Sequence, residues 1–75
     1  SPAARVISIN RQVDYRAASN SVFVPASLDQ DVCEGDAVRT GDRSRATVAF
    51  VDNIQLVIDQ NTTWVVRQPK DPAER

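Results

Sequence analysis

The sequence predicts an all-β domain made of about seven short strands. Val, Ile and Thr together supply 19 of the 75 residues, whereas Leu occurs only twice. β-branched side chains lose rotamer freedom in helices and pack well on a pleated sheet, so this composition favours strands. Apolar and polar residues alternate repeatedly along the chain, and no segment carries the apolar stripe of an amphipathic helix. A chain of this length has room for one such domain.

The overall composition argues against several classes of function. The 9 Lys and Arg residues nearly balance the 10 Asp and Glu residues, and a net charge of −1 lacks the basic excess typical of nucleic-acid binding. His, the commonest general base and neutral metal ligand, is absent. The single cysteine, Cys33, cannot form an intrachain disulfide or a Cys-rich zinc site. No apolar run reaches the roughly 18 residues of a membrane span. We therefore expect a non-catalytic chain.

Two strands are expected in the first part of the chain. Residues 1–4 carry no pattern and are expected to be a linker or a processed end. An apolar run predicts a strand over residues 5–9, and period-two alternation predicts a second strand over residues 12–17. Only Asn10 and Arg11 separate them, so we expect a tight hairpin, with Asn10 able to adopt a positive φ.

The middle of the chain predicts two further short strands. Residues 22–24 form an apolar run stopped by Pro25, which favours an edge strand because proline cannot donate to a ladder. Residues 26–31 show no clear pattern, and residues 33–36 predict a turn. A strand over residues 37–39 is bracketed by the two glycines, Gly35 and Gly41, and both are expected where φ is positive or the backbone approaches closely.

The strongest signal lies in the last third. Residues 45–51 and 54–59 both alternate, and Asp52-Asn53 between them tolerates the backbone of a tight turn, which predicts a β-hairpin. Residues 59–62 predict another turn, and residues 63–67 a closing strand. Two prolines and several charges indicate a stiff linker over residues 68–75.

The segment Glu34-Gly35-Asp36-Ala37-Val38-Arg39-Thr40-Gly41, followed by Ser44-Arg45-Ala46, resembles the core signature of the FecR-domain family. The hairpin over residues 46–58 and the closing strand Asn61 to Val65 are similar to the family's next segments. The resemblance covers residues 5–67. The family often has glycine where this chain has Arg11 and Asn53, which leaves those turn types open. The resemblance implies a twisted or solenoid-like β-sandwich in the periplasm or elsewhere outside the cytoplasm, acting in envelope signalling, with no catalytic residues.

Several residues invite a chemical interpretation that their surroundings do not favour. An acidic stretch contains Asp29, Asp31, Glu34 and Asp36, and two of these carboxylates could serve glycoside hydrolysis. Nothing in the pattern buries one of them, so a solvated loop is favoured. The Asp52-Asn53 and Asp59-Gln60-Asn61 turns lack the alternating acidic spacing of a calcium loop. Cys33 has no His partner. A small buried hydrophobe is its default interpretation, and an exposed thiol that dimerises the chain is the alternative. We expect no catalytic, cofactor or metal site.

The aromatic and arginine residues leave two alternatives each. Trp64 and Tyr15 could stack on a sugar, but Trp64 lies in an apolar strand, and a place in or beside the core is favoured for both rings. Seven of the nine cations precede residue 68 and all of these are Arg, the cation preferred at protein interfaces, although a solvated strand face is the simpler interpretation. The candidate interaction surface comprises Arg16, Arg39, Arg43, Arg45, Val22 and Val24.

The hypothesis from the sequence is therefore a non-catalytic protein-interaction module of a larger bacterial envelope protein. Its partner would be another protein or flanking domains of the parent chain, bound by surface complementarity or by strand addition at residues 22–24. The first alternative is a module that binds carbohydrate or peptidoglycan, a cell-wall glycan, through Trp64 or Tyr15. The second is an architectural spacer between other domains. No nucleic-acid partner is expected.

Overall fold

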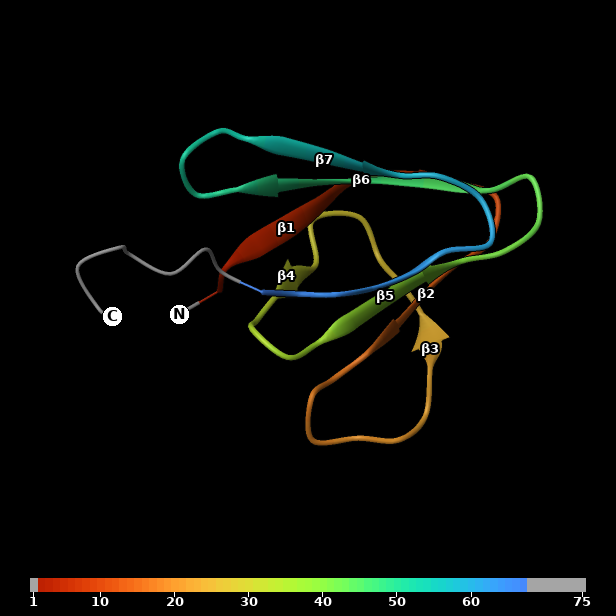
Figure 1. The fold of residues 1–75 in the computed structure, drawn as a ribbon, viewed down its shortest axis with the longest axis horizontal. Helices are drawn as coiled ribbons and strands as arrows, with labels where there is room; N and C mark the ends of the chain where they lie inside the picture. The colour runs from red at the N-terminus through yellow and green to blue at the C-terminus, as the bar shows by residue number, and fades with distance from the viewer. Residues whose placement is uncertain (1, 68–75) are drawn as a thin grey trace.

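The computed structural model describes residues 2–67, and these residues contain strands and no helix (Figure 1). The eight strands are β1 (Ala4–Asn10), β2 (Val13–Arg16), β3 (Val24–Pro25), β4 (Asp31–Val32), β5 (Ala37–Thr40), β6 (Arg45–Phe50), β7 (Gln55–Ile58) and β8 (Thr63–Val65). The predicted all-β class is confirmed. The expected linker over residues 68–75 lies outside the described residues.

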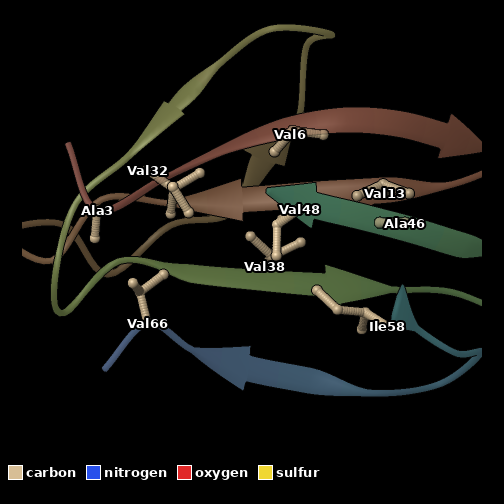
Figure 2. Packing of buried hydrophobic residues seen from close by; sticks show 10 residues of the cluster. Ala3, Val6, Val13, Val32, Val38, Ala46, Val48, Ile58 and Val66 are labelled. Atoms are coloured by element: carbon tan, nitrogen blue, oxygen red, sulfur yellow. The ribbon is translucent and has the colours of Figure 1, made fainter. Parts of the chain in front are cut away.

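Two antiparallel four-stranded sheets make up the fold. Sheet A has the strand order β4-β1-β6-β7, and sheet B has the order β3-β2-β5-β8. The largest fully buried side chains are all valines; Val6, Val32 and Val48 come from sheet A, Val38 comes from sheet B, and Val66 follows β8. Valine suits this place because its branched, compact side chain packs well against a pleated surface. The core between the sheets (Figure 2) contains Ala3, Ala4, Val6, Val13, Val32, Val38, Ala46, Val48, Ile58 and Val66.

The hairpin predicted near the C-terminus is confirmed. β6 pairs with β7 in one continuous register, from Ala46 opposite Ile58 to Ala49 opposite Gln55. Asn53 N–H donates to the Phe50 carbonyl, and Asn53 itself has φ 68°. A turn followed by one residue with positive φ is a common three-residue hairpin loop, and asparagine tolerates that conformation.

The predicted hairpin between the first two strands is wrong. β1 pairs with β4 and β6, whereas β2 pairs with β3 and β5, so the two strands belong to different sheets. Arg11, with φ 65°, turns the chain from sheet A to sheet B instead of closing a hairpin. Local turn chemistry indicates that the chain turns, but it does not specify which layer the next strand joins.

Three such corners meet at one end of the sandwich. The Gly41 N–H donates to the Gln12 carbonyl, and the Asn61 N–H donates to the Gly41 carbonyl, each at 3.0 Å. Gln12 N–H also donates to Ser44 Oγ at 3.0 Å. A Cβ on Gly41 would lie 3.2 Å from Gln12 Oε1, so glycine permits this approach. Both glycines were expected where φ is positive or the backbone approaches closely. Gly41 meets the second condition, and Gly35, with φ 92°, meets the first.

Three boundaries differ from the sequence-based expectation. The predicted linker over residues 1–4 is partly core, because Ala3 and Ala4 are buried and the Ala3 N–H donates to the Val32 carbonyl. The unassigned segment ends in β4, which is too short to show alternation. The strand expected over residues 22–24 forms at Val24–Pro25.

Candidate interaction surfaces

The outer face of sheet B carries an aromatic ring that lies close to two arginines. Tyr15 packs against the core, so its strand neighbours Asp14 and Arg16 face outward, and Arg39 lies opposite Asp14. The guanidinium carbon of Arg39 lies 3.9 Å from the centre of the Phe23 ring, and that of Arg16 lies 5.6 Å from it. Both distances are within the range of cation–π attraction. We call Phe23, Arg16, Arg39, Val22 and Val24 the Phe23 surface.

Arg39 is more firmly held than Arg16. Its guanidinium also lies 3.5 Å from Oδ2 of Asp14, whose side chain is less exposed to solvent than that of Arg39. The Arg16 guanidinium donates a 3.0 Å hydrogen bond to the Asn20 carbonyl and forms no ion pair within residues 2–67. Arg16 is therefore the cation on this surface with more capacity for an acidic group from outside.

The Phe23 surface borders an edge of sheet B, as predicted for residues 22–24. β3 is the outermost strand on that side and pairs with β2, with Val24 opposite Tyr15 and Pro25 opposite Asp14. Val22 and Val24 are 66% and 49% exposed. Val24 lies opposite the core-facing Tyr15 and so projects to the other side of the edge strand from the outward-facing Asp14, which means that the Phe23 surface continues around this edge. Exposed valines beside an unpaired edge suit an extended peptide, which can add a strand there.

The structure separates the other two candidate arginines from this surface. Arg43 and Arg45 lie at the corner between β5 and β6, around an open depression that also has Asp59 and Gln60 in its wall. Arg45 is ion-paired with Asp59 at 3.6 Å, and Arg43 has φ 53° in the turn. The six candidate residues thus form two groups rather than one surface. Phe23, which joins the first group, carried no periodic or spacing signal that would have singled it out.

Asp36 is buried, contrary to the expected solvated acidic loop. Its carboxylate accepts hydrogen bonds from Tyr15 Oη at 2.8 Å, Ala18 N at 2.8 Å and Cys33 N at 2.9 Å. Burial acts to raise the pKa of Asp36, but the three hydrogen bonds and the charge of Arg16 outweigh it and lower the pKa below its usual value. Asp36 therefore joins three segments as a structural anion, and Asp29, Asp31 and Glu34 remain exposed as expected.

Burial, and after it the adjacent Asp36 carboxylate, raise the pKa of Tyr15 to about 12. The Tyr15 hydroxyl is thereby engaged inside the fold. Trp64 is half-buried, packs against the core and meets Phe50 edge to face. Both rings occupy the places in or beside the core that the sequence favoured.

Cys33 is exposed, so its default interpretation as a buried hydrophobe is wrong. The turn that ends β4 directs the Cys33 N–H to Asp36, whereas Val32 before it is the residue in the core. Within residues 2–67, no group of three or more His, Cys, Asp or Glu side chains is placed to hold a metal ion. None of the described segments is a helix long and apolar enough to cross a membrane.

Comparison with known proteins gives no match. No family model, no curated protein and no solved structure is significantly similar to this chain.

Proposed function

We propose that this chain is a non-catalytic protein-interaction module of a larger bacterial envelope protein, that it is of the FecR-domain type, and that it lies outside the cytoplasm. The observation that carries the proposal is the Phe23 surface. Aromatic residues and arginine are enriched at protein interfaces, and the two exposed valines add apolar surface beside the open sheet edge.

The FecR-type assignment is supported by the backbone at two residues. The positions where the resemblance expects glycine are Arg11 and Asn53, and these have φ values of 65° and 68°. Glycine is the residue that adopts such values without steric cost. The extracytoplasmic location follows from the same resemblance and is part of the proposal.

The proposed partner is an extended segment that combines apolar and acidic residues. Its backbone would pair with the open edge of β3, and its apolar side chains would contact Val22 and Val24. An acidic side chain would reach Arg16, because Asp14 already neutralises Arg39. The Phe23 ring, fixed by Arg39, would present a rigid apolar contact at the centre.

Selection of binders from a displayed library of random peptides tests this proposal. The enriched peptides are then titrated into the isotope-labelled chain and followed by NMR. We expect acidic and apolar residues to be enriched, and the amide signals of residues 22–25 to shift. Phe23→Ala should weaken binding roughly 30-fold, the loss typical of a central contact, and Arg16→Gln should remove the preference for acidic residues. Arg45→Gln at the distant corner is the matched control and should bind normally.

Failure to enrich any peptide, or shifts confined to other strands, would contradict the proposal. A parallel titration with soluble peptidoglycan fragments separates it from the glycan-binding alternative. That alternative requires a change in Trp64 emission on addition of the fragments. If neither the peptides nor the peptidoglycan fragments bind, an architectural spacer becomes the better explanation of this chain.

A further inference from the structure

At the edge of sheet A, β7 is the longest of the four strands that lie at sheet edges. β3 contains Pro25, β4 has two residues, and β8 has three. β7 has four residues, Gln55-Leu56-Val57-Ile58, with no proline and no charge, and it lies at the outer margin of sheet A (Figure 1). A proline removes one donor and so limits pairing at β3 to its other backbone groups, whereas β7 keeps every donor and has no charge that would discourage pairing with a second copy.

The backbone of β7 is oriented for pairing at Val57. Phe50 N–H donates to the Ile54 carbonyl, and hydrogen-bonded and non-bonded pairs alternate along an antiparallel ladder. In the register of β6 with β7, the Val48–Leu56 pair is therefore a hydrogen-bonded one, whereas the Thr47–Val57 pair is not. The N–H and C=O groups of Val57 consequently point away from β6, toward the open edge.

The side chains of β7 are complementary to a second copy of the same strand. Leu56 and Ile58 face the core, whereas Gln55 and Val57 face outward, with Val57 57% exposed. In an antiparallel pairing about a two-fold axis perpendicular to the sheet, opposite residues must face the same side. A register centred on Val57 satisfies this condition. It places Val57 opposite itself, Leu56 opposite Ile58, and Gln55 opposite Asp59.

We propose that two copies of this chain associate through β7, paired antiparallel about a two-fold axis at Val57. The two Val57 residues exchange a pair of backbone hydrogen bonds. The Gln55 amide of each copy donates to the exposed Asp59 carboxylate of the other, which already faces Arg45 at 3.6 Å. Sheet A then continues through both copies as one sheet of eight strands. This edge is distinct from β3, so a peptide on the Phe23 surface and a second copy on β7 do not compete.

The interface is small, so we expect a weak dimer. Sedimentation equilibrium of the reduced chain should show dimerisation as its concentration rises from about 10 μM to about 1 mM. Val57→Lys should abolish it, because the axis brings the two lysines face to face. Val24→Lys on β3 is the matched control, since it adds the same charge to the other edge, and it should leave the dimer intact.

Disulfide trapping tests the register and does not depend on how Val57→Lys folds. In a Cys33→Ser background, Val57→Cys should cross-link rapidly under mild oxidation, because hydrogen-bonded partners have Cα atoms about 5.5 Å apart. Gln55→Cys should not, because the Cα atoms of the two substituted residues would be about 14 Å apart in this register.

A chain that stays monomeric up to about 1 mM would overturn the proposal. Equal cross-linking of both cysteine variants would overturn it as well, and so would loss of the dimer in Val24→Lys. None of these results bears on peptide binding at Phe23, so the two proposals fail independently.

Discussion

The hydroxyl of Tyr15 donates a 2.8 Å hydrogen bond to Oδ2 of Asp36, across 21 residues of sequence. Asp36 also accepts from the backbone N–H groups of Ala18 and Cys33. The carboxylate therefore satisfies three donors, which belong to the end of β2, the loop after it and the turn before β5. Because a carboxylate only accepts hydrogen bonds, it suits this place better than an amide or a hydroxyl.

Asp36→Ala should lower the free energy of unfolding by roughly 2–4 kcal/mol, because it leaves these donors without their acceptor. Tyr15→Phe should cost about 1.5 kcal/mol, since it removes one hydrogen bond to a charged group and leaves the other two. Urea unfolding followed by Trp64 fluorescence measures both. Asp29→Asn, an exposed residue with φ 63° that asparagine tolerates, is the control and should change little. An Asp36→Ala variant as stable as this control would refute the structural role.

Stability should depend on pH at both extremes. The pKa of Asp36 is lower in the folded state than its ordinary 3.8, so the stabilisation is complete above that pH and is lost as the pH falls below it. The pKa of Tyr15 is raised from 10.0 to about 12, so its contribution is complete below pH 10 and is lost as the pH rises to about 12. The measurement is the free energy of unfolding across a pH series. Tyr15→Phe should flatten the alkaline limb, and an unchanged alkaline limb would contradict this assignment.

The backbone at Gly35 makes a further prediction. With φ 92°, and with an added Cβ only 3.0 Å from the Ala18 Cβ, Gly35→Ala combines conformational strain with a clash. We expect a loss of about 1–3 kcal/mol. Gly41→Ala, which meets only the flexible Gln12 side chain, is the matched control and should cost less. Adding Ala18→Gly to Gly35→Ala should recover the steric part alone, and complete recovery would show that the φ value costs nothing.

Substitution of Arg11 by glycine should stabilise the fold, the opposite of the effect expected for Gly35→Ala. Arg11 holds a positive φ at the corner between β1 and β2, which an L side chain adopts at a cost. Arg11→Gly should therefore raise the free energy of unfolding by about 0.5–1 kcal/mol. This gain is what is left once the entropy that glycine adds to the unfolded chain has been subtracted. Asn53→Gly, at a similar φ, should gain less because asparagine already tolerates that region. Thermal unfolding of the two variants side by side provides the comparison, and a destabilised Arg11→Gly would contradict it.

These residues also show which parts of the fold could be predicted from the sequence. The hairpin over residues 45–59 was predictable because its two strands alternate strictly and its turn residues tolerate the required backbone. β4 was missed because two residues show no period, and Val32 is its one apolar residue. The β1–β2 connection was misassigned because local turn chemistry is the same whether the chain returns within a sheet or crosses to the other one.

The candidate sites, like the fold, contain some features that local sequence predicts and others that depend on how the strands pair. The edge at residues 22–24 was predictable from Pro25, and Arg16 and Arg39 from their residue type. The role of Phe23 depends on both arginines lying on one face, which only the pairing of β2 with β5 establishes. The burial of Asp36 likewise depends on Tyr15 and Ala18, which are distant in sequence. The exposure of β7 is a property of the strand order, and no local pattern reports it.

The contact between Phe50 and Trp64 leads to a last prediction, because it joins the two sheets. Phe50 belongs to β6 in sheet A and Trp64 to β8 in sheet B, and their rings meet edge to face, with centres 5.9 Å apart and planes at 87°. This geometry directs a ring edge, which is positive, to a ring face, which is negative. A double-mutant cycle of Phe50→Leu and Trp64→Leu, with unfolding followed by circular dichroism, should give a coupling of about 0.5–1.5 kcal/mol. Phe50→Leu with Phe23→Leu is the control, because Phe23 lies against the arginines on the outer face of sheet B, and those two changes should add to within about 0.5 kcal/mol. Equal coupling in the two cycles would mean that the loss reflects the general weakening of a small core, and not the contact between these two rings.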